Sequence, residues 1–348
     1  MKNKQVGIIG HFGGNEDILG GQTIKTKILY EELKEHTDWD ILTVDTYYKK
    51  KNPFKLLKET WRCLKSAQDI IVLLSRNGMK IYFPILSFYA KKFHTRIYHD
   101  VIGGNLDMYV KKYPEYVKYL NSFKVNWVET EGLKKKLEVN GIKNCEVLPN
   151  FKRLQIVEDE NKDFQEPYYF CTFSRVMKEK GIETAIDAVQ KINQEAGREV
   201  CKLDIYGRID AGYKDSFEQI MSQVSEAICY KGMVPYDQSV KIIKDYHALL
   251  FPTYWDGEGF PGTIVDAFSA GLPVLATDWN CNGEIIENKK NGILYPNDEI
   301  KDLKSAIEWI LQNNRKMNDM RHNCIASAQK YQPDAYVKKI ILKIIGKN

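Results

Sequence analysis

The sequence has no closely spaced cysteine pair and no long apolar segment. Seven cysteines are scattered among 348 residues without any C-x-x-C spacing. This argues against a zinc site or a disulfide framework, and it favours a reducing cytosol. The longest apolar stretches, residues 70–74 and 81–90, are too short to cross a lipid bilayer. The apolar start of the chain ends at Gly10, so it predicts a first strand and not a signal peptide.

The sequence also lacks the signatures of common nucleic-acid and phosphate-binding proteins. No recognition helix, zinc finger or RNA-binding pattern is present, and the G-x-x-x-x-G-K-[ST] spacing of a P-loop is absent. Charge is nevertheless uneven, because residues 1–150 hold 25 Lys and Arg against 17 Asp and Glu, a balance of +8. A basic half predicts contact with an anionic partner, and membrane lipid or a lipid diphosphate fits that description.

Short apolar runs alternate with helical patterns along the chain, which is typical of an α/β fold. With 43% hydrophobic and 28% charged residues, 348 positions suffice for two globular domains. We expect a first domain at residues 1–155 and a second at 156–333. A last helix at 334–348 is expected to pack back on the first domain. The polar, acidic segment 151–166 is interpreted as the linker.

A basic amphipathic helix is predicted at residues 54–67, directly after a lysine triplet at 49–51. Two interpretations stay open. The helix either packs its apolar residues against the domain or rests with them on the inner leaflet of a membrane. The apolar residues at helical spacing are Phe54, Leu57, Trp61 and Leu64.

Residues 249–278 carry the clearest ligand-binding pattern. A buried strand leads into an acidic, glycine-rich loop, and a short helix and another strand follow. Loops between parallel strands and helices are where α/β proteins bind ligands. Gly259 and Gly262 allow the backbone to approach a ligand, and the free N–H groups of the helix start attract an anion such as phosphate. Asp266 lies eight positions after Glu258, on a side of the helix that can face the ligand.

Glu258, Asp266 and the run AFSAGLPVLATD resemble the E-x7-E signature of retaining glycosyltransferases with the GT-B architecture, above all glycosyltransferase family 4. The resemblance covers nearly the whole chain and is specific from about residue 168 to residue 295. It implies two Rossmann-like domains whose parallel sheets face a central cleft. One departure matters, because the second acid is Asp266 where the family usually has Glu.

The resemblance also implies roles for individual residues of the donor site. Arg175 and Lys180 match the R-x4-K-G run that holds the donor diphosphate. Glu258 is expected to accept hydrogen bonds from the donor sugar and Asp266 from the ribose. The base is expected near Met233 and Val234. The other expected donor-binding residues are Gly20, Gly21, Gly207, Gly259, Phe260, Pro261, Gly262 and Thr263.

His99 is expected to join Glu258 in the catalytic site. A lone histidine at a strand end is most often structural, but related enzymes carry one at a comparable strand end near the donor sugar. Asp100 is a weaker candidate. Asp38 and Asp40 have the D-x-D spacing of metal-dependent glycosyltransferases of another fold, but they lie at a helix-to-strand turn and are interpreted as solvated. We expect no metal ion, and no cofactor besides the donor.

Together these features predict a cytosolic, membrane-associating, retaining glycosyltransferase. It would move a sugar from a nucleotide-diphosphate sugar, with UDP favoured over GDP, to a glycan or lipid-linked acceptor in cell-surface polysaccharide synthesis. No nucleic-acid partner is expected. Two alternatives stay open. One is a non-catalytic nucleotide-binding partner subunit, which Asp266 motivates, and the other is a nucleotide-sugar hydrolase or epimerase of the same fold.

Overall fold

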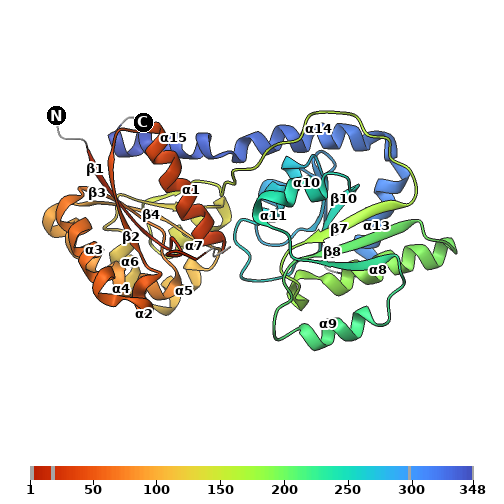
Figure 1. Cartoon of the computed structure of the whole chain (residues 1–348), viewed down its shortest axis with the longest axis horizontal. Helices are drawn as coiled ribbons and strands as arrows, with labels where there is room; N and C mark the ends of the chain where they lie inside the picture. The colour runs from red at the N-terminus through yellow and green to blue at the C-terminus, as the bar shows by residue number, and fades with distance from the viewer. Residues whose placement is uncertain (1–3, 17–19, 297–298, 347–348) are drawn as a thin grey trace. The chain divides into compact units, whose positions relative to one another are not determined.

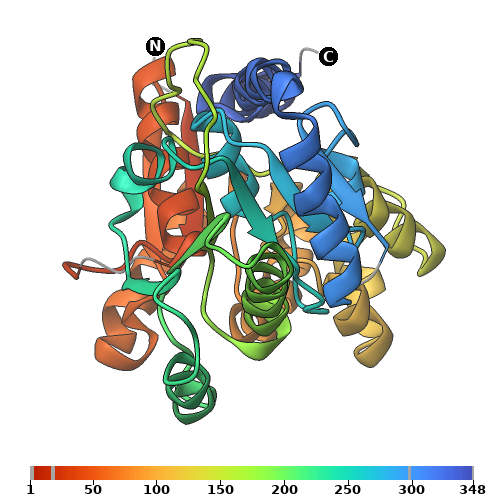
Figure 2. The ribbon, with the colours of Figure 1, turned by 90° about the vertical axis from the view of Figure 1, so that its right-hand side faces the viewer.

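The computed structural model describes residues 4–16, 20–296 and 299–346. The chain forms two compact units, Met1–Arg153 with Gln332–Asn348, and Leu154–Tyr331. Their elements are labelled in Figure 1 and drawn from a second side in Figure 2. The predicted boundaries at 155 and 333 lie within two residues of these limits. The last helix is predicted to reach residue 348, but residues 347–348 lie outside the described part.

The first unit is built on a six-stranded parallel sheet with the order β2-β1-β3-β4-β5-β6. Parallel neighbours need crossover connections, and helices supply them. The strands are β1 (Gln5–Gly10), β2 (Asp40–Asp45), β3 (Asp69–Val72), β4 (Arg96–Asp100), β5 (Val125–Val128) and β6 (Cys145–Val147). The helices are α1 (Gly21–His36), α2 (Tyr48–Lys51), α3 (Pro53–Ser66), α4 (Arg76–Phe93), α5 (Leu106–Lys112), α6 (Glu115–Leu120), α7 (Glu131–Val139) and α15 (Pro333–Ile345).

Different helices cover the two faces of this sheet. Ile70 and Val72 of β3 pack into one apolar cluster with Leu64 of α3 and Phe83 of α4. Because successive side chains of a strand point to opposite faces, Ile71 lies on the other face. There α1 and α15 are neighbours (Figure 1). Within the described ranges, no helix has both the length and the apolar character that a membrane span requires.

Helix α3 has apolar residues on two sides. Leu64 is buried, whereas Phe54, Leu57 and Trp61 have 83%, 65% and 60% of their surface exposed. The adjacent α4, which is joined to α3 by a hydrogen bond between the Thr60 and Tyr82 hydroxyl groups, also exposes large apolar side chains. These are Ile81, Ile85, Phe88 and Phe93. The predicted apolar stripe is therefore split, because only its last member packs into the core.

The second unit also contains a six-stranded parallel sheet, with the order β12-β11-β10-β7-β8-β9. The strands are β7 (Tyr168–Phe173), β8 (Cys201–Tyr206), β9 (Ile228–Gly232), β10 (Ala248–Phe251), β11 (Val274–Thr277) and β12 (Gly292–Tyr295). The helices are η1 (Lys178–Lys180), α8 (Ile182–Ala196), α9 (Lys214–Met221), η2 (Tyr236–Gln238), α10 (Ser239–Ile243), α11 (Gly262–Ser269), α12 (Asn282–Ile285), α13 (Ile300–Gln312), η3 (Asn314–Lys316), α14 (Met317–Ala328) and η4 (Gln329–Tyr331).

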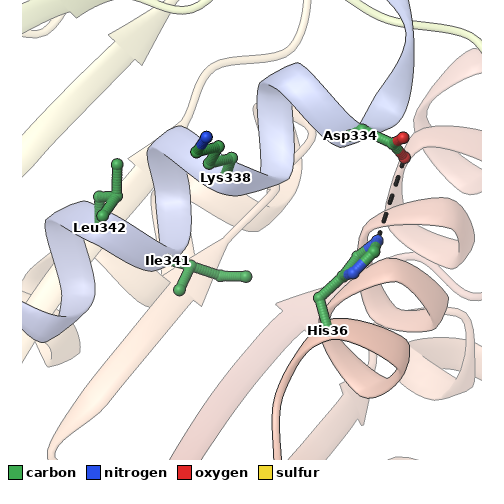
Figure 3. Close-up of a pocket in the computed structure, with 5 residues that line it drawn as sticks. All are labelled: His36, Asp334, Lys338, Ile341 and Leu342. Carbon is green, nitrogen blue, oxygen red and sulfur yellow. Dashed lines mark ion pairs between the residues drawn. The ribbon is translucent and has the colours of Figure 1, made fainter.

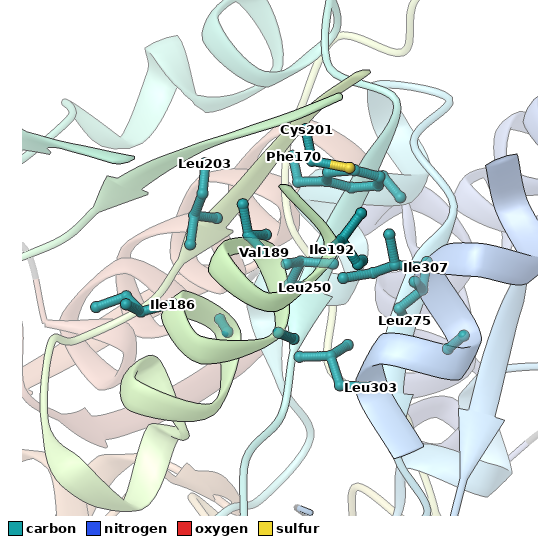
Figure 4. Packing of buried hydrophobic residues seen from close by; sticks show 14 of the residues in the cluster. Phe170, Ile186, Val189, Ile192, Cys201, Leu203, Leu250, Leu275, Leu303 and Ile307 are labelled. Atoms are coloured by element: carbon teal, nitrogen blue, oxygen red, sulfur yellow. The ribbon is translucent and has the colours of Figure 1, made fainter. Parts of the chain in front are cut away.

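Alternating side chains of the second sheet build two cores. Leu250 of β10 and Leu275 of β11 pack with α8 and α13 on one face, and Figure 4 shows this cluster around Val189 and Ile307. Leu249, one position earlier on β10, packs with α11 and α14 on the other face. Strands buried on both faces read as continuous apolar runs, which explains the runs that the sequence contains.

The acidic segment 151–166 is not the free linker that its composition predicts. Leu154 and Phe164 are buried in the two cores of the second unit, and the Val157 N–H donates to the Ser269 carbonyl over 2.9 Å. The boundary between the two units lies inside this segment, between Arg153 and Leu154, as the linker interpretation predicts, but a few apolar side chains fix the rest of the segment on the second unit despite the charges around them.

Candidate functional site

The loops after β7 and β10 lie at the switch point of the second sheet. The two strands are paired, with Leu249 beside Cys171. From this pair the sheet continues through β8 and β9 on one side and through β11 and β12 on the other. Both loops therefore leave the same edge of the sheet, at the carboxyl ends of its strands. In open α/β sheets this place is the usual ligand site.

Lys180 and Glu258 join these two loops. Lys180 ends η1 after β7, Glu258 follows β10, and their side chains form an ion pair with only 7% and 9% of their surface exposed. The Thr253 hydroxyl donates to the same Glu258 oxygen over 3.2 Å, and the Lys180 ammonium group lies 4.9 Å from the Trp255 ring. Burial lowers the pKa of Lys180, and the attraction of Glu258 partly opposes that shift. The pair thus holds a cation and a carboxylate in fixed positions, with little water around them.

The loop after β10 is anchored by residues that the sequence analysis did not single out. The Trp279 indole donates to the Trp255 carbonyl over 3.1 Å, and the Asn280 amide donates to the Glu258 carbonyl over 3.1 Å. Trp279 and Asn280 follow β11, so a third loop at the same edge supports the loop after β10. Their position directly after a predicted strand, in the run T-D-W-N-C, was a usable signal.

Two glycines allow the chain to pack closely at this edge. Gly207 follows β8 with φ +136°, and a Cβ there would lie 1.7 Å from the Ser174 carbonyl oxygen. Gly181 precedes α8 with φ +69°, and its Cβ would lie 2.1 Å from the Pro252 carbonyl oxygen. Only glycine fits such close contacts with backbone. Gly207 therefore has a structural role, whatever it contributes to donor binding.

Arg175, Met233 and Val234 lie at the carboxyl ends of β7 and β9 and reach solvent. The Arg175 side chain is 57% exposed, and its guanidinium group lies 4.0 Å from the Asp210 carboxylate. Met233 is 69% exposed, and Val234 is half-buried. Arg175 is thus a cation that a ligand can recruit, and Met233 offers an apolar surface to a planar group.

Helix α11 begins at Gly262 without a side-chain cap. The Ile264 N–H donates to the Pro261 carbonyl over 3.0 Å, and the first N–H groups of a helix, here those of Gly262 and Thr263, point toward the side where an anion can bind. The Thr263 hydroxyl donates to the last carbonyl of β7 over 2.5 Å, so the helix start is fixed to the sheet. Of the predicted loop residues before it, Phe260 and Pro261 are buried and Gly259 is partly exposed.

Asp266 points into the protein. It is 1% exposed, and its Oδ1 accepts a hydrogen bond from the Ser239 hydroxyl of α10 over 2.8 Å. Ser239 is equally buried. The Asp266 side chain, which is shorter than the usual Glu, thus forms a hydrogen bond with Ser239. Its carboxylate is buried and does not lie on an open surface of the site. Ser239 is a candidate residue that the sequence analysis did not identify, since a lone serine in a helix gives no signal.

The glycines predicted in the first unit lie in open surroundings. Gly20 and Gly21 are exposed at the start of α1, and a Cβ at Gly21 would meet no other atom within 4 Å. Local packing therefore does not explain why position 21 is a glycine. The close approach of a ligand to this position stays a prediction. Residues 17–19, directly before Gly20, lie outside the described residues.

His99 lies inside the core of the first unit. It has no exposed surface, its Nδ1 is 3.1 Å from the Asn126 side-chain oxygen, and its ring packs edge-on against Phe83 at 5.1 Å. Burial lowers the pKa of His99 to about 4, so the imidazole is neutral at pH 7. These are the surroundings of a structural histidine, and contact with a substrate would require the ring to become accessible. Asp100 is buried too, 2.9 Å from the Lys25 ammonium group.

A family model matches the second unit of this chain, and several known proteins resemble part of the chain in sequence. Residues 155–331 match the family described as Glycosyl transferases group 1. The chain is 24% identical over 146 residues to the amylovoran biosynthesis glycosyltransferase AmsK of Erwinia amylovora. This match covers 41% of this chain and 35% of AmsK. It is 30% identical over 164 residues to the UDP-N-acetylglucosamine--peptide N-acetylglucosaminyltransferase GtfA subunit of Streptococcus pneumoniae serotype 4. This match covers 45% of this chain and 31% of that protein. The chain thus spans about a third of the length of these two relatives.

Solved structures share the fold over nearly the whole chain. Anabaena Alr3699/HepE, in complex with UDP and glucose, aligns with a TM-score of 0.72 at 13% identity and covers 99% of this chain and 100% of its own. A sucrose-phosphate synthase from Thermosynechococcus elongatus aligns with a TM-score of 0.75 at 14% identity and covers 97% of each chain. These likenesses confirm the predicted GT-B fold class, with two Rossmann-like units. Because the family match covers more than half of its residues, the chain belongs to the group 1 glycosyl transferases.

Proposed function

We propose that this chain is a retaining glycosyltransferase that moves a sugar from a nucleotide-diphosphate sugar to a glycan or lipid-linked acceptor. The observation that carries the proposal is the buried ion pair of Lys180 and Glu258. Glu258 lies four residues before the start of α11. A cation, a carboxylate and a helix N-terminus thus meet on neighbouring loops. A nucleotide-diphosphate sugar offers anionic phosphates beside sugar hydroxyl groups, which suits this combination.

In the proposed reaction, the bond between the anomeric carbon and a diphosphate oxygen breaks, and the acceptor oxygen bonds to that carbon. The transition state has oxocarbenium character, and negative charge grows on the departing diphosphate. Fixed cations aimed at that charge lower the barrier. We assign this role to Lys180, which Glu258 holds in place, and to Arg175, which the ligand would draw from solvent. The acceptor proton leaves on the diphosphate, so the scheme needs no protein base.

The other proposed contacts follow the edge of the second sheet. Glu258 would accept hydrogen bonds from the donor sugar, and the base would lie on the apolar surface of Met233 and Val234. The pair of Asp266 and Ser239 would line the ribose end. UDP is the favoured nucleotide, since the similar folds include Alr3699/HepE with UDP and glucose and the pneumococcal O-GlcNAc transferase GtfA with UDP and GlcNAc.

We also infer that the reaction at this site needs no metal ion. Two cations, Lys180 and Arg175, take the part that a metal would have against the diphosphate. The D-x-D pair of Asp38 and Asp40 suits no such role. Asp40 is exposed at the amino end of β2, where the Gln5 amide donates to its carboxylate over 2.7 Å. Ligands of parallel sheets bind at the carboxyl ends.

The first unit is proposed to bind the acceptor and to rest on the inner face of the cell membrane. Phe54, Leu57 and Trp61 are exposed on α3, and the lysines of segment 49–51 and of α3 lie around them. An apolar patch with a basic rim suits an anionic bilayer. The names of AmsK and of the putative colanic acid biosynthesis glycosyltransferase WcaL support a role in cell-surface polysaccharide synthesis.

A panel of nucleotide sugars tests the proposal. UDP-glucose, UDP-N-acetylglucosamine, UDP-galactose and GDP-mannose are each added to the full chain, and the shift of the unfolding temperature is measured. A ligand that binds the folded state raises this temperature, and we expect at least one UDP-sugar to do so. The shift should vanish in Lys180→Ala and persist in the control Lys178→Ala. Binding without transfer to any acceptor would favour the non-catalytic subunit, and nucleotide release without an acceptor would favour the hydrolase.

A further inference from the structure

Three possible metal ligands from α1 and α15 converge in the first unit. Glu32 and His36 lie four residues apart, and therefore on the same face of α1. Asp334 lies in the first turn of α15. One ligand atom of each residue lies within 4.8 Å of the other two. The His36 Nε2 atom is 3.3 Å from Glu32 Oε2 and 4.0 Å from Asp334 Oδ1.

Within the described residues, one oxygen of the Glu32 carboxylate has the His36 ring as its polar neighbour and accepts no hydrogen bond. Glu32 is 4% exposed, and Arg153 donates from two nitrogens to its Oε1. Its Oε2 is buried, accepts no hydrogen bond from the part of the chain that the structure describes, and lies 3.3 Å from His36 Nε2, which is an ion pair only when the ring is protonated. Beside a neutral ring whose Nε2 carries no proton, this oxygen lacks a partner, which is costly for a buried carboxylate. An ion between the two atoms would satisfy both.

A pocket opens beside these residues. It has a volume of about 250 Å³ and is lined by His36, Asp334, Lys338, Ile341 and Leu342. Figure 3 shows the ion pair of His36 and Asp334 at one end of it, with the Lys338 side chain directed away from His36. The ligand atoms of His36 and Asp334 are therefore accessible from solvent, and a bound ion could keep a water molecule on the pocket side.

We propose that Glu32, His36 and Asp334 bind a divalent transition-metal ion of the zinc type. Bonds of about 2.0–2.1 Å in a tetrahedral site place two ligand atoms about 3.4 Å apart. The Glu32–His36 distance already has this value, and the longer His36–Asp334 distance closes with a rotation of the exposed Asp334 side chain. One imidazole and two carboxylates suit zinc. Arg153 donates to the other Glu32 oxygen, Oε1, and so orients the carboxylate with Oε2 toward His36.

The ion would cross-link α15 to α1. Asp334 is in the first turn of α15, so the bond would fix the start of the helix that returns to the first unit after residue 331. The expected effect is on stability, because an ion that binds only the folded state raises its stability. This inference does not depend on the proposed transfer reaction.

Calorimetry of Zn²⁺ binding to the full chain, stripped of metal by a chelator and then desalted, tests the site. We expect one saturable site, at least tenfold weaker in His36→Ala and in Asp334→Asn. The matched control is His322→Ala, because His322 is a partly exposed histidine that also pairs with a carboxylate, that of Asp159. It should bind zinc like the unmodified chain. His36 and Asp334 are both exposed, so neither substitution threatens the fold.

A second measurement identifies the ligands. Co²⁺ in a site of this kind should give visible absorption that is lost in His36→Ala and kept in His322→Ala. Absence of saturable Zn²⁺ binding would overturn the proposal. So would equal zinc affinity in the unmodified chain, His36→Ala and Asp334→Asn, since another group would then hold the ion.

Discussion

Lys180 and Glu258 form a buried ion pair although they lie 78 positions apart in the sequence. The pair joins the loop after β7 to the loop after β10 at the switch point of the second sheet. A charge buried without its partner is unfavourable by several kcal/mol, so each side chain depends on the other. The same ammonium group is the one that we expect to meet the donor diphosphate.

Lys180→Met should lower the free energy of unfolding by about 3 kcal/mol, because it leaves Glu258 buried without a counter-charge. The double variant Lys180→Met/Glu258→Gln should regain more than half of that loss. Urea unfolding measures both. Lys178→Met, an exposed lysine of the same short helix, is the control and should change stability by less than about 0.5 kcal/mol. A double variant as unstable as the sum of its single changes would contradict the coupling.

His99 should make the protein sensitive to acid. Its pKa falls from 6.5 to about 4 in the folded state because the ring is buried. The unfolded chain therefore takes up a proton first, and stability is lost as the pH falls from 6.5 to 4. Below about 4 the loss stops growing. The loss of stability from this group amounts to at most about 3.4 kcal/mol.

Thermal unfolding of His99→Phe between pH 7.5 and 4 measures this contribution. The variant should lose less stability over that range than the unmodified chain. His247 is buried in the second unit with a pKa also near 4, so a residual slope is expected. Identical slopes in both proteins would contradict the assignment. A large loss of turnover at pH 7.5 in a stable His99→Phe would instead support the catalytic role predicted from the sequence.

The Asp266–Ser239 hydrogen bond allows two roles of Asp266 to be separated. Asp266→Ala should weaken UDP binding by about 1.5–3 kcal/mol if the carboxylate contacts the ribose. Ser239→Ala removes the hydrogen bond but keeps the carboxylate, so it should mainly lower stability, by about 1–2 kcal/mol. Calorimetry with UDP and urea unfolding of both variants provide the two values. Unchanged UDP affinity in Asp266→Ala would show that this acid has only a structural role.

The exposed face of α3 should bind anionic vesicles. Phe54→Ser/Trp61→Ser removes two exposed apolar side chains and should reduce sedimentation with vesicles that contain anionic lipid. Each lysine near such a surface contributes about 1 kcal/mol, so binding should also fall as salt is added. Val139→Ser is the control, because Val139 is 88% exposed on α7 of the same unit. Equal binding to neutral and anionic vesicles, or to neither, would contradict the membrane proposal.

Much of the fold could be predicted from the sequence because buried parallel strands give unbroken apolar runs. Residues 249–251 and 274–277 were read in this way and form β10 and β11. Segment 151–166 does contain the boundary between the units, but its packing could not be predicted, because the burial of Leu154 and Phe164 depends on distant elements. The exposure of Phe54, Leu57 and Trp61 could not be predicted either, since periodicity gives a helix its faces but not the partner of each face.

The site was predictable where it rests on local pattern. Glu258 was predicted from its acidic, glycine-rich loop and Lys180 from the resemblance of its run to the R-x4-K-G run. The structure brings the two side chains together, and their roles at the donor stay predictions. The partners Thr253, Trp255 and Ser239 were not found, because each contacts the site through a tertiary hydrogen bond or ring contact. The burial of His99 could not be predicted, since a strand end in the sequence does not say toward which face the side chain points, and its catalytic role stays a prediction.

The rate of sugar transfer by Lys180→Ala tests the central claim most directly. The donor is the nucleotide sugar that the stabilisation panel selects, and EDTA is present throughout. The temperature is kept low enough for all proteins to stay folded, because EDTA would also remove an ion bound at the proposed site of Glu32, His36 and Asp334. The account predicts that the unmodified chain and Lys178→Ala transfer sugar at similar rates and that Lys180→Ala is about a hundredfold slower. An unimpaired Lys180→Ala, or transfer that EDTA abolishes and Mn²⁺ restores, would contradict leaving-group stabilisation by this lysine without a metal ion.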